Sequence, residues 1–285
     1  MSDSVQTDGD KALAQAIIND FHEYFSSPPP LTKGSRYVLP HALITVPLPP
    51  ALGGLTTETF ADMYERVGQL LLGQYDSGVK SFTHRLAEPN AEVWVSGNIA
   101  AVFVGWSASV DGRDIVHTVH LCSLHRIRNQ NSNYGNPWRI SGLVDMMHLS
   151  PEIPVPPVET GPVLEIIAPF EALLAYIKAR DWKAIVPLLL PGGGATILQG
   201  SQAPVTFVWP EFIKQLQVEA ESGPVTEKKL FNCEARRCSD LAFVWAPFML
   251  VTDGRELGQG VSVCSFRLEE GQWLITGLQE TSFDK

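Results

Sequence analysis

Several features that would assign this chain to a familiar class are missing from its 285 residues. Charged residues make up only 18%, and the net charge of −10 comes without any cluster of Lys and Arg. Nucleic-acid binding depends on a basic surface that neutralises phosphates, so we expect no nucleic-acid partner. No apolar run approaches the ~20 residues of a membrane-spanning helix, so we expect no membrane segment.

Targeting, metal-binding and phosphate-binding signals are missing as well. Residues 1–11 are polar and acidic, without the basic and apolar regions of a signal peptide, which favours a cytoplasmic protein. The four cysteines form no C-x-x-C pair of a zinc site, and we expect no metal. Pro191–Gly194 lacks the G-K-[ST] ending of a phosphate loop and is interpreted as a turn. We therefore expect no cofactor.

The chain contains an internal repeat, which is the feature that decides its fold. Residues 98–126 align without a gap with residues 240–268, and both segments carry a D-G-R tripeptide. The sequence W-R-I-S-G-L at Trp138–Leu143 then matches W-L-I-T-G-L at Trp273–Leu278.

The repeat predicts two copies of one domain, over residues 1–149 and 168–285. Between them, residues 150–167 are rich in proline, which disfavours helix and central strand and predicts a semi-rigid linker.

Each copy is predicted to begin with helices and to end with strands. In the first copy we expect helices near Ala12–Phe25 and Thr59–Val67, a short strand at Glu92–Val95, and long strands at Ile99–Val110, Ile115–Ile127 and Trp138–Leu149. Asp111-Gly112 is typical of a two-residue hairpin turn. Strands rich in Val, Ile, Trp and Phe must bury one face against the helices, so the fold class is α+β.

This order of elements, with its D-G-R hairpin and closing W-x-I strand, resembles the nuclear transport factor 2-like superfamily. The nearest branches are the SnoaL-like polyketide cyclases and the ketosteroid isomerase type, and the resemblance covers both copies. It implies two cone-shaped domains, each a curved antiparallel sheet wrapped around N-terminal helices, that form a pseudo-dimer within one chain. The superfamily includes isomerases, cyclases and dehydratases as well as proteins that only bind or scaffold, so fold does not fix function.

The resemblance also points to site residues. Cyclase and epoxide-hydrolase relatives often carry a carboxylate five positions after the Ile of the last strand, and these positions are Asp145 and Glu280 here. Relatives also place a polar catalytic group on the strand before the hairpin, where this chain has Trp106 and Phe248.

Counting outward from the hairpin turn pairs Trp106 with His117, Val104 with Val119 and Phe103 with His120. Alternation then puts His117 and Val119 on one face, and Thr118 and His120 on the other. If Asp145 lies opposite Val119, it becomes a diagonal neighbour of His117. A slip of one residue would reverse this arrangement.

A histidine beside a carboxylate in apolar surroundings suits proton transfer, so His117 and Asp145 are the predicted catalytic residues. The alternative is that His117 makes one hydrogen bond in a packed sheet. The predicted substrate-binding residues are Trp106, Val104, Val119, Leu143 and Met147. We expect Thr118, His120 and Ser262 on the outer face, at the interface of the pseudo-dimer, and His22 in solvent.

The second copy is chemically poorer, because all seven histidines lie at or before His148. Gln259 replaces His117 there, and the pocket candidates are Glu280, Gln259 and Phe248. We therefore expect the first copy to be active and the second to be structural or to hold a modified pocket.

These features predict a cofactor-independent acid–base enzyme, an isomerase, cyclase or dehydratase of secondary metabolism. Its substrate would be a hydrophobic, oxygenated small molecule such as a polyketide or terpenoid intermediate. The alternative is a non-catalytic ligand-binding or scaffold protein.

Overall fold

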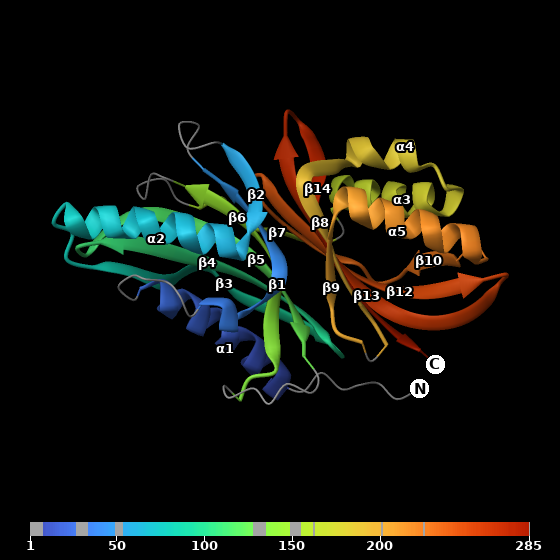
Figure 1. Cartoon of the computed structure of the whole chain (residues 1–285), viewed down its shortest axis with the longest axis horizontal. Coiled ribbons are helices and arrows are strands. Elements are labelled where there is room, and N and C mark those ends of the chain that lie inside the picture. Colours follow the sequence, from blue (N-terminus) through green and yellow to red (C-terminus); the bar gives the residue numbers. More distant parts are fainter. Residues whose placement is uncertain are drawn as a thin grey trace. The chain divides into compact units, whose positions relative to one another are not determined.

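The structure is a computed structural model that describes residues 8–26, 34–48, 54–127, 135–148, 155–161, 163–200, 202–224 and 226–284. It consists of two compact units, residues 1–157 and 158–285, and each is described by itself (Figure 1). No helix of the described residues is long and apolar enough to cross a membrane.

Unit 1 is a mixed sheet with helices packed against one face. Its elements are α1 (Asp8–Phe25), the 3-10 turn η1 (Gly34–Arg36), β1 (Val38–Pro47), β2 (Leu55–Thr59), α2 (Phe60–Asp76), β3 (Phe82–Ser96), β4 (Ile99–Val110), β5 (Arg113–Arg126) and β6 (Trp138–His148). The strand order is β2-β1-β6-β5-β4-β3. The pairing of β1 with β6 is parallel and the other pairings are antiparallel, so the sheet is mixed rather than antiparallel as predicted.

Unit 2 repeats this plan. Its elements are β7 (Glu159–Gly161), α3 (Leu164–Ala179), α4 (Trp182–Ile185), η3 (Val186–Leu188), β8 (Leu189–Gln199), β9 (Val205–Val208), α5 (Trp209–Ser222), β10 (Thr226–Leu230), β11 (Glu234–Cys238), β12 (Leu241–Thr252), β13 (Arg255–Glu269) and β14 (Gln272–Asp284). The strand order is β7-β11-β12-β13-β14-β8-β9, and β10 also pairs with β12. Its parallel pair, β14 with β8, corresponds to β6 with β1.

The two predicted hairpins are confirmed. Asp111 and Gly112 both have positive φ, at 48° and 78°, and join β4 to β5. Asp253 and Gly254, at 51° and 75°, join β12 to β13 in the same way. Both central residues of a type I′ turn need positive φ, which is why Asp-Gly is favoured there.

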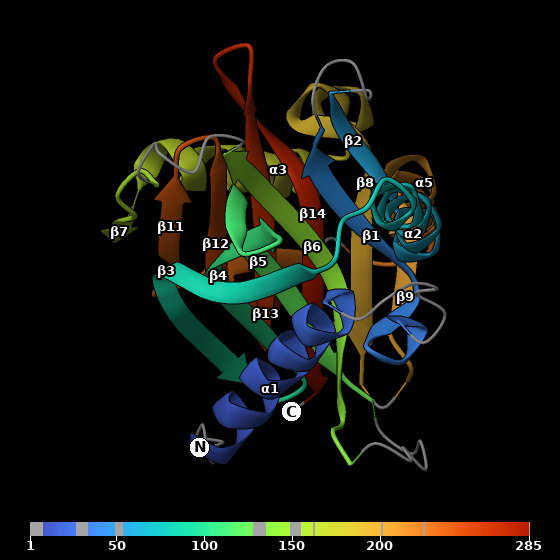
Figure 2. The same cartoon turned by 90° about the vertical axis from the view of Figure 1, so that its left-hand side faces the viewer.

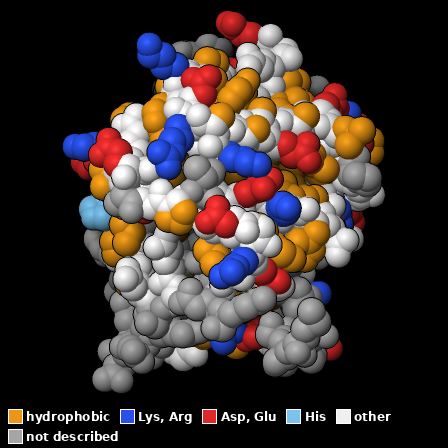
Figure 3. All heavy atoms as spheres, turned by 90° about the vertical axis from the view of Figure 1, so that its right-hand side faces the viewer, with side chains coloured by type: hydrophobic (Ala, Val, Ile, Leu, Met, Phe, Trp, Pro, Cys, Tyr) orange, Lys and Arg blue, Asp and Glu red, His pale blue; other side chains and the backbone are white. Residues whose placement is uncertain are grey.

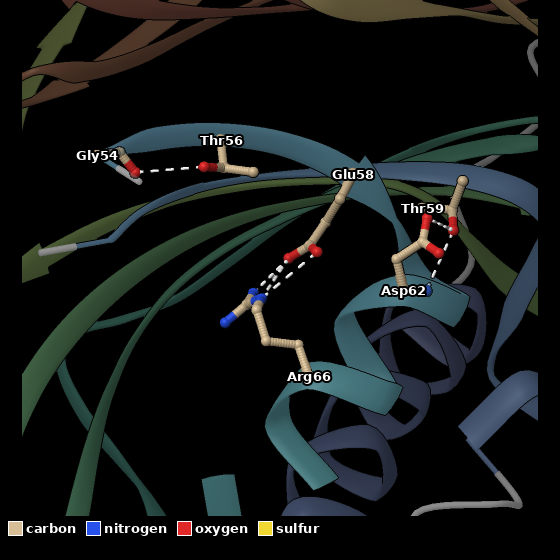
Figure 4. Close-up of polar contacts among 6 residues, drawn as sticks. All are labelled: Gly54, Thr56, Glu58, Thr59, Asp62 and Arg66. Atoms are coloured by element: carbon tan, nitrogen blue, oxygen red, sulfur yellow. Dashed lines mark hydrogen bonds and ion pairs between the residues drawn. The ribbon is translucent and has the colours of Figure 1, made fainter. Parts of the chain in front are cut away.

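The start of α2 shows how local sequence sets an element boundary (Figure 4). The Thr59 hydroxyl accepts a hydrogen bond from the backbone N–H of Asp62 at 3.2 Å and so caps the helix. The Thr59 hydroxyl also donates to the Asp62 carboxylate at 2.6 Å. One turn later, Arg66 forms an ion pair with Glu58 at the end of β2.

The core of unit 1 lies between α1, α2 and one face of the sheet, and α1 crosses the sheet in Figure 2. Its buried residues on the sheet include Val102, Val104, Trp106, Cys122 and Leu143. These residues alternate along β4, β5 and β6 with residues of the opposite face. Any side chain that shares their alternation therefore points toward the helices.

Three sequence interpretations need correction. The strand predicted at Glu92–Val95 is the end of the much longer β3, which continues beyond a bulge between Ala87 and Glu92. Pro191–Gly194 is not a simple turn but lies within β8, where the chain bulges between its pairings to Ile275 and Gly277.

The predicted linker, residues 150–167, is also too long. Within it, β7 pairs with β11, and α3 already begins at Leu164, so this part belongs to unit 2. Residues 150–154 and 162 lie outside the described residues.

Candidate functional site

The β4–β5 hairpin pairs one residue out of the predicted register. Val110 faces Arg113 and Ser109 faces Asp114, but Ala108 then faces Val116. Ile115 is thus an extra residue, a β-bulge close to the turn. The predicted pairings of Trp106 with His117, Val104 with Val119 and Phe103 with His120 are therefore wrong.

Beyond the bulge, Trp106 faces Thr118 and Val104 faces His120. Because side chains alternate, the shift moves Thr118 and His120 to the face that carries Val104 and Trp106 in the core. The expectation that these two residues lie on the outer face is wrong for the same reason.

On the next strand, Asp145 faces His120 rather than Val119, and His117 faces His148. His117 and Asp145 consequently lie on opposite faces of the sheet, and the predicted pair does not form. Of the predicted substrate-binding residues, Trp106, Val104, Leu143 and Met147 share the face of Asp145. Val119, which pairs with Met146, lies on the other face.

His120 is held at both ring nitrogens. Its Nδ1 lies 2.5 Å from Oδ1 of Asp145, and its Nε2 lies 2.6 Å from the hydroxyl oxygen of Thr118. His120 and Asp145 are only 7% and 6% exposed, whereas Thr118 is partly exposed. The contact at Nδ1 is an ion-pair contact and not a hydrogen bond of favourable angle. In the tautomer that carries its proton on Nδ1, Nε2 accepts a hydrogen bond from the Thr118 hydroxyl.

Two further histidines surround this pair. His22 on α1 stacks on Trp106, with ring centroids 3.7 Å apart, and meets the His120 ring edge-on at 4.7 Å. His84 on β3 approaches His22 through their Nδ1 atoms, 3.5 Å apart. Three histidines, one carboxylate and one indole thus gather on the helix-facing side of unit 1.

The expectation that His22 faces solvent is wrong, since it is only 2% exposed. The sequence did contain a signal for this position. The buried residues of α1 include Ile18 and Phe21, and His22 follows Ile18 by four residues, which places it on the same helical face.

Burial controls the charge of the outer two histidines. Desolvation, with smaller contributions from His120 and His84, lowers the pKa of His22 well below its ordinary value. Desolvation and the nearby His120 lower the pKa of His84 to about 4. Both are therefore neutral near pH 7. Burial and the nearby Asp145 raise the pKa of the Cys122 thiol, so this cysteine is protonated and unreactive.

Three buried nitrogens of the site have no hydrogen-bond partner among the residues that the structure describes. They are Nε2 of His22, the indole nitrogen Nε1 of Trp106 and Nδ1 of His120, although the last lies in ion-pair contact with Asp145. An unpaired buried polar group is costly, on the order of 1–3 kcal/mol, and such groups are often completed by water or a ligand.

The equivalent place in unit 2 holds an ion pair. Glu280 lies opposite Ser262, accepts a hydrogen bond from its hydroxyl at 2.9 Å, and pairs with Lys228 of β10. Ser262, expected on the outer face, thus points toward the helices of unit 2. Lys228 also lies over the ring of Phe248, 4.9 Å from its centroid.

Gln259 is paired with Met249, whereas Phe248 is paired with Gly260, so Gln259 lies on the face opposite to Phe248. Of the second-unit pocket candidates, the structure therefore brings Glu280 and Phe248 together through Lys228, and leaves Gln259 outside.

Within the described ranges, no group of three or more His, Cys, Asp or Glu side chains is arranged to hold a metal ion.

No model of a known protein family matches the sequence, and no curated protein matches it. Solved structures do match. A nuclear transport factor 2-like (NTF2-like) protein of unknown function from Pseudomonas putida KT2440 is 15% identical with a TM-score of 0.37, over 43% of this chain and 89% of that one. A ketosteroid isomerase-like protein from Erwinia carotovora atroseptica is 13% identical with a TM-score of 0.34, over 44% and 98%.

A third match is the CaMKII hub of S. rosetta, 17% identical with a TM-score of 0.36, over 43% of this chain and 98% of the hub. Structures named for the superfamily that the sequence resembles are thus among those similar to the chain, and each covers about half of it.

Proposed function

We propose that unit 1 is a cofactor-independent acid–base catalyst that moves a proton on a hydrophobic, oxygenated small molecule. The observation that carries the proposal is the buried pair of His120 and Asp145, whose Nδ1 and Oδ1 atoms lie 2.5 Å apart. A carboxylate at Nδ1 fixes the tautomer of an imidazole and stabilises its protonated form, which leaves Nε2 as the nitrogen that exchanges protons. His120 thus has the catalytic role that we predicted from the sequence for His117.

The surroundings support this role. His22 and His84 have lowered pKa values and stay neutral near pH 7, which leaves the histidine beside the carboxylate as the proposed base. Trp106 and Val104 supply apolar surface on the same face. A positioned base of this kind can drive isomerisation, cyclisation or dehydration beside a carbonyl group. A polyketide or terpenoid intermediate with acidic protons beside a carbonyl is the substrate class that fits these groups.

Unit 2 is proposed as a structural or modified copy. Ser262 stands where unit 1 has His120, and Glu280 is neutralised by Lys228. The carboxylate of unit 2 has no imidazole beside it, so this place lacks the group that we propose as the base of unit 1. The pseudo-dimer, the cytoplasmic location and the absence of a nucleic-acid or membrane partner stay predictions.

The proposal is tested by hydrogen exchange on model ketones. A β,γ-unsaturated bicyclic ketone and an aryl β-diketone are incubated with the protein in D2O, and loss of the protons beside the carbonyl is followed by NMR. We expect faster exchange with wild-type protein than with His120→Ala. Exchange at the buffer rate with every such probe, alongside measurable binding, would favour the ligand-binding or scaffold alternative.

A further inference from the structure

Thr118, His120 and Asp145 form a continuous chain of hydroxyl, imidazole and carboxylate. The hydroxyl oxygen lies 2.6 Å from Nε2 of His120, and Oδ1 of Asp145 lies 2.5 Å from Nδ1. This is the connectivity in which a base activates a hydroxyl nucleophile: the carboxylate on one ring nitrogen and the hydroxyl on the other. We propose that Thr118 is a nucleophile, and that unit 1 also transfers acyl groups from activated esters and thioesters.

The exposure of the three residues supports Thr118 as the member that meets the substrate. His120 and Asp145 are buried, and Thr118 is the partly exposed member. An incoming carbonyl group therefore meets the hydroxyl oxygen before it meets the ring. His22 from α1 and His84 from β3 also face His120, and both are neutral near pH 7, so neither opposes a positive charge on that imidazole.

Trp106 is the candidate donor for the developing negative charge. Trp106 faces Thr118 across the β4–β5 pair, and no described residue accepts a hydrogen bond from its indole N–H. Preorganised N–H groups of this kind stabilise the oxyanion of acyl transfer, and removing one typically costs ~10²–10³-fold in rate.

In the first half of the reaction, Thr118 Oγ1 bonds to the carbonyl carbon, the hydroxyl proton passes to His120 Nε2, and the carbonyl electron pair moves onto oxygen. That pair then returns, the bond to the leaving group breaks, and the leaving alcohol or thiol takes the proton from Nε2. In the second half, water bonds to the acyl carbon and gives its proton to Nε2. The bond between the acyl carbon and Thr118 Oγ1 then breaks, the carboxylic acid departs, and Oγ1 takes the proton back from His120 Nε2.

The equivalent positions of unit 2 carry different residues. By register, Gly260 occupies the position of Thr118, Ser262 that of His120, and Glu280 that of Asp145. Gly260 has no hydroxyl where unit 1 has Thr118, and Ser262 has no imidazole where unit 1 has His120, so acylation is expected in unit 1 alone.

The test uses the full chain with p-nitrophenyl acetate and an N-acetylcysteamine thioester. Release of nitrophenolate is followed by absorbance, and the acyl group is located by peptide mass spectrometry after acid quenching. We expect a burst and an acyl group on Thr118. Thr118→Ser should keep the label, and Thr118→Val should lose it.

Two further variants test whether acylation depends on Asp145 and whether the loss of a hydroxyl elsewhere in unit 1 affects it. Asp145→Asn should slow acylation by roughly 10²–10⁴-fold. Thr57→Val, which removes a hydroxyl that contacts Thr45 at 3.0 Å, should leave it unchanged. Melting temperatures of all variants check that they fold.

The proposal is overturned if wild-type protein carries no acyl group on Thr118, or if Thr118→Val is labelled at the wild-type rate. Labelling confined to lysine or cysteine would also overturn it. None of these results bears on exchange of ketone protons, so failure here leaves the acid–base proposal to its own experiment.

Discussion

His120 and Asp145 occupy paired positions on β5 and β6, and their Nδ1 and Oδ1 atoms lie 2.5 Å apart while both side chains are buried. The β-bulge at Ile115 makes this pairing possible, because it turns His120 toward the helices. The relationship separates unit 1 from unit 2, where Ser262 and Glu280 occupy the same positions.

Asp145→Asn should lower the rate of proton exchange on the model ketones by about 10²–10⁴-fold. The amide keeps the volume of the side chain but removes the charge that stabilises the protonated imidazole, so the fold should survive. The matched control is Glu280→Gln at the equivalent position of unit 2, which should change the rate little. Equal losses in the two variants would place chemistry in both units.

The histidine cluster should make stability depend on pH. The folded-state pKa of His84 is about 4 and that of His22 is also lowered, whereas an unfolded histidine titrates near 6.5. Between these values the unfolded chain binds more protons, so the free energy of unfolding should fall as pH drops from 7 to 4. His84 alone should contribute on the order of 1–3 kcal/mol.

Urea denaturation at several pH values measures this dependence. His84→Phe removes one titrating group and should flatten the dependence of the unfolding free energy on pH over that range. His41→Phe, at an exposed position of β1 outside the cluster, controls for the exchange of a histidine for a phenylalanine. An identical slope for wild type and His84→Phe would contradict the placement of His84 in the cluster.

The ion pair of Lys228 and Glu280 in unit 2 predicts that the effects of replacing either residue on the free energy of unfolding are strongly coupled. Lys228→Met should destabilise the protein by about 2–4 kcal/mol, because Glu280 would then be a largely buried carboxylate without its cation. Adding Glu280→Gln should recover most of that loss. A double-mutant cycle by chemical denaturation measures the coupling, and simple additivity of the two effects would argue against the pair.

Gly105 should tolerate no side chain. A Cβ at this position would collide with the carbonyl oxygen of Glu88 on the bulged part of β3, so Gly105→Ala should be destabilising. The control is Gly73→Ala inside α2, where an added Cβ meets nothing and helix propensity predicts a gain of about 0.5–1 kcal/mol. Thermal melting of both variants should show opposite shifts.

Much of the fold was predictable from the sequence because the repeat made each copy support the interpretation of the other. The Asp-Gly turns and the bounds of β4 came from local signals that need no tertiary context. The long β3 and the bulged β8 were missed, because Pro89 and Gly192 normally interrupt strands, and here they lie in bulges.

Part of the candidate site could be predicted from the sequence. Asp145 and Trp106 were selected and lie at the site, but one bulge residue, Ile115, exchanged the roles of His117 and His120. A bulge leaves no reliable mark in sequence, and strand alternation turns its single extra residue into a change of face. His84 was overlooked because β3 was not recognised as a strand at that point.

The most direct test compares His120→Ala with His117→Ala in the exchange of ketone protons in D2O. The two histidines lie three residues apart on one strand, and only His120 contacts Asp145. We expect His120→Ala to lose about 10²–10⁴-fold in rate, while His117→Ala stays within a few-fold of wild type. A large loss in His117→Ala, with His120→Ala unaffected, would contradict this expectation.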